Sequence, residues 1–250
     1  MSQRHDAYRG FADHYDLHGW DWYAPTYGPR LFRMIEEKGL ARCRVLDAGC
    51  GTGTLALELA QRGHRVVGTD LSEPMIAAAR KKDAAGRVAW YVADITAQDL
   101  TRQEEPFDLA TCVADTLNHL ETLDLWEQAF RRLAAHLRGG GWLFFDVMTC
   151  RGLERLDKFV AEEKDGRMLV AAIVYEPATR RSTVKVTSFV SCPGTALFER
   201  ASETITEWGQ PVAGILERLQ LAGFHSVEQP FAQQDDPEKD DRLGILARKR

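Results

Sequence analysis

Residues 45–53 read Val-Leu-Asp-Ala-Gly-Cys-Gly-Thr-Gly, and residues 55–62 continue as the amphipathic Leu-Ala-Leu-Glu-Leu-Ala-Gln-Arg. An apolar run, a glycine-rich turn and an amphipathic segment, in this order, predict a strand, a turn and a helix. Glycines at positions 49, 51 and 53 carry no side chain, so a ligand can lie directly against the turn backbone. Amides at the start of the following helix offer hydrogen-bond donors and partial positive charge. The turn therefore predicts a binding site for a small molecule.

The next apolar run, Val66-Val-Gly-Thr-Asp70, predicts a second parallel strand that ends in an acid. An acid at this position can accept hydrogen bonds from both hydroxyls of a ribose, so the predicted ligand contains a nucleoside. Dinucleotide sites have the spacing Gly-x-Gly-x-x-Gly, whereas the glycines here alternate and follow Asp47. A carboxylate at Asp47 would repel a pyrophosphate but attract the ammonium and sulfonium groups of S-adenosyl-L-methionine. The charge of the turn therefore favours S-adenosyl-L-methionine, and a nicotinamide dinucleotide stays as the alternative ligand.

Five motifs in chain order resemble those of the class I S-adenosylmethionine-dependent methyltransferases. The first is Asp47-Ala-Gly-Cys-Gly-Thr-Gly53, and the second is Gly68-Thr-Asp70-Leu-Ser-Glu-Pro-Met75. The third is Ala93-Asp94-Ile95. Residues 107–115 resemble the fourth strand of the family and its carboxyl end, and residues 137–146 resemble the turn and the fifth strand. The resemblance covers most of the chain.

The resemblance implies which residues contact the cofactor, S-adenosyl-L-methionine, whose demethylated product is S-adenosyl-L-homocysteine. In the family, the acid of the second motif holds the ribose, which assigns this role to Asp70. The acid of the third motif accepts from the adenine amino group and the next residue packs on the ring, which assigns these roles to Asp94 and Ile95. The full set of expected cofactor contacts is Tyr8, Tyr15, Asp47, Gly49, Cys50, Gly51, Asp70, Leu71, Met75, Asp94, Ile95 and Cys112.

The order of the predicted elements indicates an α/β protein with a Rossmann-like, doubly wound sheet. Their alternation predicts a parallel sheet with helices on both faces. The resemblance implies seven strands, of which the last is antiparallel. Strands are expected near residues 44–48, 65–69, 88–93, 108–113 and 141–147, with helices near 54–62, 74–81 and 122–137. After the insertion, residues 212–222 predict a helix, and residues 224–229 and 243–247 predict strands.

Four segments are expected along the chain. Residues 1–40 form an N-terminal helical lid of two helices joined near residues 19–27, and residues 41–150 form the cofactor-binding core. Residues 151–206 form an antiparallel β insertion that covers the acceptor site, and residues 207–250 complete the core sheet. In the insertion, three stretches alternate apolar with polar residues and predict antiparallel strands. These stretches are 168–175, 182–191 and 196–206, while the acidic segment 235–241 predicts an exposed loop.

Composition limits the partners of the protein. The 250-residue chain has a formal net charge of −5, whereas a nucleic-acid partner would require a concentrated basic face, so no nucleic acid is expected. No apolar run is long enough for a membrane span and the first residues lack a hydrophobic signal segment, so no membrane association and a cytoplasmic location are expected. Five cysteines without Cys-x-x-Cys spacing agree with a reducing compartment and no zinc ribbon. His14 and His18 have helical ligand spacing but no evident third ligand, so no metal is expected.

Two residues after the fourth predicted strand are catalytic candidates. Methyl transfer is an in-line displacement at the sulfonium carbon, so the protein mainly aligns the nucleophile and excludes water. Asp115 could hold an acceptor amine, and His119 could take a proton from an acceptor that arrives protonated. Each has a structural alternative, because Asp115 can cap the following turn and His119 can pack against the helix at 122–137.

The leader supplies further candidates. Tyr8-Arg-Gly-Phe-Ala-Asp-His-Tyr15-Asp resembles the N-terminal element of small-molecule methyltransferases that folds over the cofactor as a lid. This resemblance implies that a tyrosine hydroxyl reaches the cofactor carboxylate or the acceptor, which makes Tyr15 a third catalytic candidate. Tyr8 and Tyr15 are seven residues apart and would share one face of a helix, although that face could instead be core. Trp20 and Trp22 could line the acceptor pocket or anchor the leader.

The insertion at 151–206 indicates the class of acceptor. An antiparallel roof suits a compact acceptor better than a duplex or a protein surface, and it resembles the arrangement in small-molecule N-methyltransferases. The expected reaction is methyl transfer to nitrogen or oxygen of a small molecule, such as an amine, an amino sugar, an amino acid or a natural-product intermediate. The exposed strands could instead pair two copies into a homodimer. A nicotinamide-dependent oxidoreductase and a non-enzymatic S-adenosylmethionine-binding regulator are the alternative functions.

Overall fold

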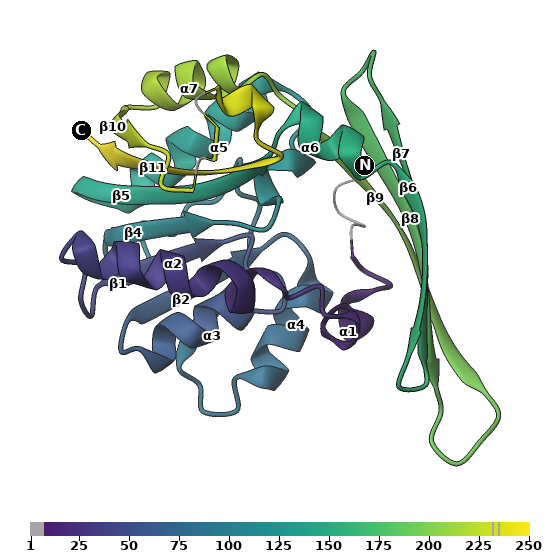
Figure 1. The fold of residues 1–250 in the computed structure, drawn as a ribbon. Coiled ribbons are helices and arrows are strands. Elements are labelled where there is room, and N and C mark those ends of the chain that lie inside the picture. Colours follow the sequence, from purple (N-terminus) through teal and green to yellow (C-terminus); the bar gives the residue numbers. More distant parts are fainter. Residues whose placement is uncertain (1–7, 232, 235) are drawn as a thin grey trace.

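The computed structural model describes residues 8–231, 233–234 and 236–250. The first seven residues of the expected lid, and the first residue of the expected acidic loop, therefore lie outside the described residues. The chain forms two sheets, which stand side by side in Figure 1. None of the helices in the described ranges has both the length and the apolar character needed to cross a membrane.

The larger sheet has the strand order β10-β11-β5-β4-β1-β2-β3. The five neighbouring strands β5, β4, β1, β2 and β3 pair in parallel. Strand β11 runs antiparallel to both β5 and β10. The predicted α/β, doubly wound seven-stranded sheet with an antiparallel last strand is thus confirmed. The strands are β1 (Arg44–Ala48), β2 (Arg65–Asp70), β3 (Val88–Val92), β4 (Phe107–Cys112), β5 (Leu137–Met148), β10 (Phe224–Glu228) and β11 (Arg242–Lys249).

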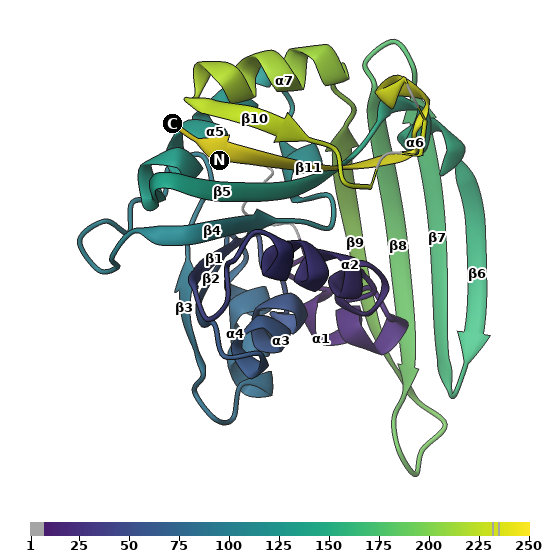
Figure 2. The same cartoon turned by 60° about the vertical axis from the view of Figure 1, so that its left-hand side comes forward.

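Helices cover both faces of this sheet because each has one apolar face. In α5, Trp126, Phe130 and Leu133 are fully buried at helical spacing against the sheet, and the Thr122 side chain accepts from the Leu125 amide to cap the helix. One face carries α2 (Tyr23–Glu37), α3 (Thr54–Gln61) and α4 (Glu73–Lys82), and the other carries α5 (Leu123–His136) and α7 (Val212–Leu221). Figure 2 shows the two layers of helices on either side of the strands.

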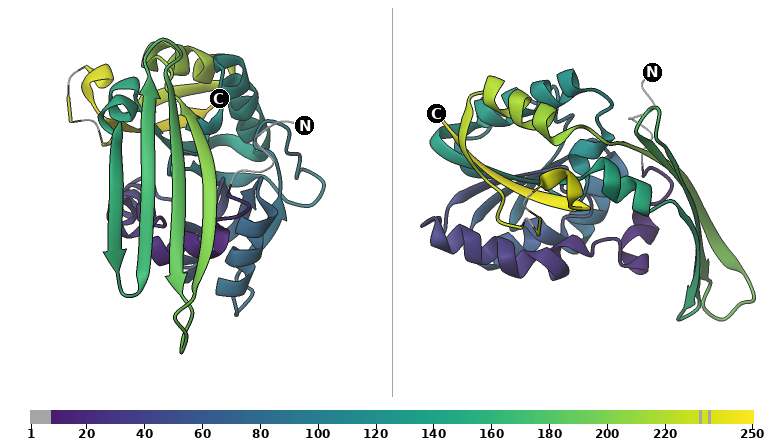
Figure 3. Two further views of the ribbon diagram at one scale, coloured as in Figure 1. Left: turned by 90° about the vertical axis from the view of Figure 1, so that its right-hand side faces the viewer. Right: turned by 45° about the horizontal axis from the view of Figure 1, so that its top comes forward.

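The second sheet, called the flap below, is inserted between β5 and α7 after the short helix α6 (Cys150–Arg155). Successive strands pair antiparallel, and the left view of Figure 3 shows the sheet face-on. Its strands are β6 (Lys158–Lys164), β7 (Arg167–Glu176), β8 (Arg181–Ser191) and β9 (Phe198–Trp208). The sequence missed β6, because Lys-Phe-Val-Ala-Glu-Glu-Lys is a mostly charged and exposed edge strand without a clear apolar face.

The leader differs from its prediction. It forms a single turn of helix, α1 (Ala12–Tyr15), a 3₁₀ turn, η2 (Asp16–His18), and then α2, which begins inside the expected junction. Tyr8 lies outside any helix, with a positive φ of 62°. Tyr8 and Tyr15 therefore do not share a helical face, although a turn brings their rings edge to face at 5.7 Å between centroids.

The leader lies between the core and the flap. Phe11 is fully buried and packs against flap residues of β7, β8 and β9. The Ser188 hydroxyl of β8 lies 2.7 Å from Nδ1 of His14 and 2.6 Å from Nε2 of His18, so both histidines hold the leader to the flap. Figure 1 shows α1 in this position at the edge of the core that faces the flap.

Candidate active site

A cavity of about 570 Å³ lies where the glycine turn, the leader and the flap meet. It is at the carboxyl ends of β1, β2 and β4, where the strand order reverses and where ligands of such sheets bind. Its volume lies within the range of small-molecule pockets, roughly 300–1,000 Å³. Its lining includes Tyr8, Tyr15, Trp20, Asp21, Tyr23, Asp47, Gly49, Cys50, Gly51, Thr52, Asp70, Leu71, Ser72, Met75, Asp94, Ile95, Val113, Thr116, His119, Arg181, Thr183, Glu203, Thr206 and Trp208.

The three alternate glycines have two different roles. All three have positive φ, with values of 72° at Gly49, 54° at Gly51 and 80° at Gly53. A Cβ at Gly49 would lie 2.2 Å from the side chain of Thr116, and a Cβ at Gly53 would lie 2.4 Å from the ring of Trp90. At Gly51, no atom of the described residues beyond the two chain neighbours lies within 4 Å of such a Cβ. The absence of a side chain therefore accommodates protein side chains at Gly49 and Gly53, whereas at Gly51 it leaves space that a ligand could fill.

Asp47 presents a buried carboxylate oxygen without a partner. The residue is 1% exposed, and its Oδ1 accepts from the Thr111 hydroxyl at 2.7 Å. Its Oδ2 is buried and has no hydrogen-bond partner in the described part of the chain. Burial raises the pKa of Asp47 to about 7, with the Thr111 hydrogen bond acting in the opposite direction and the charge of Asp70 adding to the rise. A cationic group in the cavity would therefore stabilise the ionised form of Asp47.

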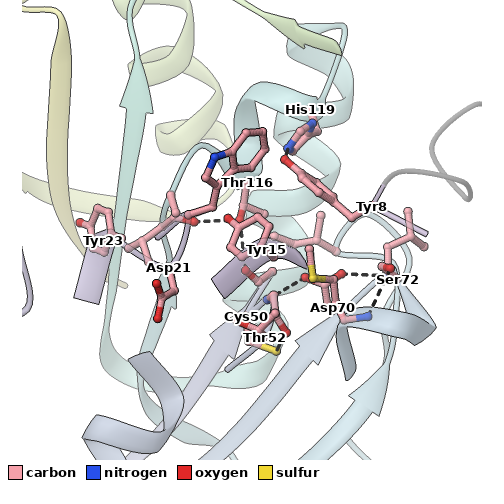
Figure 4. A pocket seen from close by; sticks show the side chains of 18 of the residues that line it. Tyr8, Tyr15, Asp21, Tyr23, Cys50, Thr52, Asp70, Ser72, Thr116 and His119 are labelled. Carbon is pink, nitrogen blue, oxygen red and sulfur yellow. Dashed lines mark hydrogen bonds between the residues drawn. The ribbon is translucent and has the colours of Figure 1, made fainter. Parts of the chain in front are cut away.

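Asp70 closes the glycine turn from the end of β2. Its Oδ2 accepts from the Gly51 amide at 2.9 Å, and its Oδ1 accepts from the Ser72 amide at 2.8 Å. Burial raises the pKa of this carboxylate, while hydrogen bonds from three backbone amides partly offset the rise. A carboxylate has about four lone-pair sites, so Asp70 can still accept from a ligand. Figure 4 shows Asp70, Ser72 and Cys50 gathered at this corner of the cavity.

Three apolar side chains and one carboxylate lie together in the cavity lining. Leu71, Met75 and Ile95 line it together with Asp94. Oδ1 of Asp94 accepts from both the amide and the hydroxyl of Thr96, at 2.8 and 2.7 Å, which fixes the orientation of the carboxyl group. Apolar side chains with one fixed carboxylate among them have the polarity to hold a purine ring that carries an amino group.

Two carboxylates of the leader lie against the start of α3. Oδ1 of Asp16 accepts from the Thr52 hydroxyl at 2.6 Å, and Oδ2 of Asp21 accepts from the Thr54 hydroxyl at 3.2 Å. Lys82 pairs with Asp16 at 2.6 Å and also donates to both threonines. The positive end of the helix is therefore already matched by carboxylates, which makes it a poor site for a pyrophosphate.

Three parts of the molecule meet at His119. The hydroxyl of Tyr8, in the leader, lies 3.2 Å from Nε2, and the carbonyl of Thr206, in β9, lies 3.1 Å from Nδ1. A carbonyl only accepts, so Nδ1 carries the proton and Nε2 accepts from Tyr8. Burial lowers the pKa of His119, which keeps the imidazole neutral, although the Thr206 carbonyl and the charge of Asp115 act in the opposite direction. Figure 4 shows the Tyr8 and His119 side chains end to end above Tyr15.

Asp115 was expected to contact the acceptor, but its side chain does not line the cavity. Its backbone is left-handed, with φ 65°, and its carboxylate binds Arg242 of β11 at 2.6 and 2.8 Å. Arg242 also pairs with Asp146, at the end of β5, and its guanidinium lies 4.9 Å from the centre of the Trp22 ring. Burial alone would lower the pKa of Arg242, but Asp146 and Asp115 outweigh it and raise the pKa. Asp115 neither caps the following turn nor lines the cavity.

Cys112 is the other expected contact that the structure keeps out of the cavity. It has no exposed surface and lies in the apolar core between the sheet and α5, while the next residue along, Val113, lines the cavity. The alternation of side chains across the sheet explains the one-residue error, because successive residues point to opposite faces. The other expected contacts, namely Tyr8, Tyr15, Asp47, Gly49, Cys50, Gly51, Asp70, Leu71, Met75, Asp94 and Ile95, all line the cavity.

Sequence reasoning missed the residues that come from distant segments. Arg242 and Thr116 were not assigned a role from any motif. Strand β9 was predicted to end at Thr206, but it continues through Glu207 to Trp208. Their only sequence signal was the continued alternation Ile-Thr-Glu-Trp beyond residue 204. In the described ranges, no group of three or more histidine, cysteine, aspartate or glutamate side chains could hold a metal ion.

Comparison with known proteins agrees with this geometry. Residues 45–141 match the family model described as a methyltransferase domain. YqeM of Bacillus subtilis strain 168, which carries a methyltransferase name, is 26% identical over 249 residues, covering 97% of each chain. A crystal structure of an S-adenosylmethionine-dependent methyltransferase from Clostridium acetobutylicum has a TM-score of 0.81 at 21% identity, covering 97% of this chain and 98% of that one. CalS10 of Micromonospora echinaspora, an amino pentose methyltransferase solved with S-adenosylmethionine bound, has a TM-score of 0.68 at 20% identity, covering 89% of each chain.

The fold and the cavity define an enzyme of the Rossmann-like class that binds a nucleoside-containing cofactor at the carboxyl edge of its sheet. Residues 45–141 carry a methyltransferase domain, and the fold of the chain is that of the S-adenosylmethionine-dependent methyltransferase from Clostridium acetobutylicum.

Proposed function

We propose that the enzyme transfers the methyl group of S-adenosyl-L-methionine to nitrogen or oxygen of a small molecule. The observation that carries this proposal is the open face of the turn at Gly51 beside the unpartnered Oδ2 of Asp47. A buried carboxylate oxygen without a partner is rare and is matched by the ammonium group of the cofactor. The residues present therefore fit a cationic amino-acid end at Asp47 and a ribose at Asp70.

The remaining cofactor contacts follow from the shape of the cavity. The adenine would lie against Leu71 and Ile95, with its amino group donating to Asp94. When bound, the cofactor supplies the electrophilic methyl group, so the protein needs to align an acceptor and exclude water. The leader contributes to both tasks, because Phe11 and the two histidines on Ser188 hold it between the core and the flap.

The acceptor would enter between the leader and the flap, next to Tyr8, Tyr15 and His119. A neutral imidazole that accepts from Tyr8 can take up a proton through that hydroxyl as the acceptor loses one. Tyr8 and His119 would hold the nitrogen or oxygen of the acceptor next to the methyl group that the bound cofactor would supply. Tyr15 lies edge to face with Tyr8 and Trp20, at 5.7 Å between centroids in each case, and is placed to contact the acceptor.

The two alternatives fit the cavity less well. A nicotinamide dinucleotide would bring a pyrophosphate next to Asp16, Asp21 and Asp47, which would repel it. A non-enzymatic regulator would need no space beyond the cofactor, whereas the cavity continues along β8 and β9 to Arg181 and Trp208. All five cysteines are free thiols, which supports our further proposal of a cytoplasmic location.

One experiment tests the proposed function directly. The protein is incubated with S-adenosyl-L-methionine labelled in its methyl group and with a fractionated metabolite extract, and the labelled products are identified by mass spectrometry. The expected result is label in one or a few low-molecular-weight compounds. Binding of NADH without binding of S-adenosyl-L-homocysteine, or label confined to protein or nucleic acid, would contradict the proposal.

A further inference from the structure

A single lysine ties three segments of the chain together beside the glycine turn. The ammonium group of Lys82, at the end of α4, lies 2.6 Å from Oδ2 of Asp16 in the leader. It also donates to the hydroxyl of Thr52, in the glycine turn, at 3.0 Å, and to that of Thr54, at the start of α3, at 2.8 Å. An ammonium group has three N–H donors, so these three contacts can use all of them. Lys82 therefore connects the leader to the core at the turn.

The two threonine hydroxyls complete this network, which is called the latch below. Thr52 donates to Oδ1 of Asp16 at 2.6 Å, and Thr54 donates to Oδ2 of Asp21 at 3.2 Å. Thr52 is 3% exposed, whereas the side chains of Lys82 and Asp16 are 30% and 31% exposed. Because Thr52 follows Gly51 directly, the latch joins the leader to the backbone that is proposed to contact the cofactor.

The apolar contacts of the leader are of a different kind. Phe11, Tyr15 and Trp20 pack in the apolar cluster of the flap, whereas α2, which begins at Tyr23, packs in a cluster of the core. The segment that carries the first three rings is thus held to the flap by apolar packing and to the glycine turn by the polar latch. Partly exposed polar groups can exchange their bonds for bonds to water, so the latch can open at a lower cost than the apolar contact.

The leader also forms part of the cavity wall. Tyr15 and Trp20 line the same cavity as Gly51. Asp16 follows Tyr15 directly in the chain, so a movement of the leader that breaks the bond between Asp16 and Lys82 would also move Tyr15. Opening of the latch would therefore change the cavity wall next to the proposed cofactor site.

We infer that the leader opens for ligand exchange and that Lys82 is a positioning residue that holds it against the glycine turn. The inference rests on the proposed methyltransferase function, because the exchanged ligands would be the cofactor and its product. Lys82 is not among the described residues that line the cavity, so it acts through Asp16 and Thr52. All bonds of the latch join protein atoms, so they can form whether the cofactor site is filled or empty. Breaking the latch should therefore speed ligand entry and ligand release equally.

Stopped-flow measurement of S-adenosyl-L-homocysteine binding and release tests the role of Lys82. In Lys82→Met, the association and dissociation rate constants should each rise by about fivefold, the upper range for a partly exposed ion pair. Their ratio, the Kd, should change by less than about twofold. Lys38→Met is the matched control. The side chain of Lys38 is 25% exposed, pairs with Glu228 at 2.6 Å and is not among the described residues of the cavity lining, so neither rate constant should change.

The two rate constants together separate a latch from a support of the binding site. Rate constants equal to those of the wild type in Lys82→Met would overturn the inference while leaving the proposed function standing. Faster release without faster binding would also overturn it, because the Kd would then weaken as expected for damage to the site itself. Failure of the wild type to bind S-adenosyl-L-homocysteine would count against the proposed function.

Asp16→Asn offers a second variant, and the double variant tests whether the two residues act through one contact. Asp16→Asn removes the other charge of the pair, so it should raise both rate constants as Lys82→Met does. Changes that break one shared contact do not add, so the double variant should exchange ligand no faster than the faster single variant. Rate increases that multiply in the double variant would show that the residues act independently and would contradict the latch.

Discussion

The hydroxyl of Tyr8 and Nε2 of His119 lie 3.2 Å apart, although 111 positions separate the two residues in the chain. Because Nδ1 of the same ring donates to Thr206, one imidazole connects the leader, the core and the flap. A movement of the leader away from the core would break the hydrogen bond between Tyr8 and His119. The pair of Tyr8 and His119 therefore couples the position of the leader to the position of the proton acceptor, Nε2 of His119.

Tyr8→Phe tests this coupling. Removing the hydroxyl leaves the ring packed on Tyr15 but deprives His119 of its partner, so turnover on the labelled substrate should fall by about a hundredfold. The Kd of S-adenosyl-L-homocysteine should change by less than threefold. Tyr27→Phe makes the same chemical change outside the cavity lining and should leave turnover unchanged. Equal turnover of Tyr8→Phe and the wild type would remove the pair from the mechanism.

Asp70→Ala tests the ribose assignment. The change removes an acceptor that also fixes the amides of Gly51 and Ser72, so cofactor binding should weaken by roughly 1.5–3 kcal/mol, the range for hydrogen bonds to a charged group. Isothermal titration calorimetry with S-adenosyl-L-homocysteine gives the value. A dissociation constant equal to that of the wild type would refute the assignment.

Gly51→Ala separates ligand contact from backbone strain. A left-handed alanine costs about 1–2 kcal/mol of stability wherever it occurs. Gly51 and Gly86 both have positive φ, at 54° and 59°, and a Cβ at either would meet no atom of the described chain within 4 Å apart from those of its chain neighbours. Urea denaturation should therefore show similar losses of stability for the two variants. Only Gly51→Ala should weaken binding of S-adenosyl-L-homocysteine, by more than tenfold, and equal binding by the two variants would contradict the position of the ligand.

The pKa of Asp47 predicts how cofactor binding depends on pH. With a pKa of about 7 in the free protein, Asp47 becomes protonated as the pH falls, and the ligand ammonium must displace that proton. Binding of S-adenosyl-L-homocysteine should therefore be strongest above pH 7 and weaken by up to about tenfold for each pH unit below it. Asp47→Asn should bind weakly at every pH between 6 and 8. A flat profile in the wild type would show that the ligand ammonium lies elsewhere.

Arg242→Met tests the buried ion pairs. It leaves Asp146 and Asp115 without their cation, and breaking a buried pair from one side typically costs about 3–5 kcal/mol. The free energy of unfolding in urea should fall by that amount. Arg155→Met, whose guanidinium is exposed and pairs with Asp241, should change it by less than about 1 kcal/mol. Equal losses in the two variants would mean that the Arg242 pairs contribute little.

The cofactor end of the site could be predicted because its residues are local in sequence. Strand, turn and helix follow one another around Asp47 and Gly51, and Asp70 closes the next strand, so their spacing in the sequence predicted that these residues meet at the cavity. Among the strand-end residues, Cys112 was expected to line the cavity, but the next residue, Val113, lines it instead. Successive side chains of a strand point to opposite faces, so an error of one residue moves the expected contact to the wrong face.

The acceptor end could not be predicted in the same way, because it is assembled from distant segments. Asp115 looked like an acceptor contact until the fold placed Arg242, 127 positions further along the chain, against its carboxylate. Trp208, which lines the cavity, was assigned to the segment after the insertion, since the strand was expected to end at Thr206. Such pairings depend on sheet topology and not on local spacing, so only the three-dimensional structure could show them.

Calorimetric titration of the wild-type protein with S-adenosyl-L-homocysteine tests most directly whether the cavity at Gly51 and Asp47 holds the adenosyl cofactor. One molecule should bind per chain with a Kd in the micromolar range or tighter, and NADH should give no heat of binding at the same concentration. No heat with S-adenosyl-L-homocysteine, or binding that survives unchanged in Gly51→Ala and Asp70→Ala together, would contradict the proposed site.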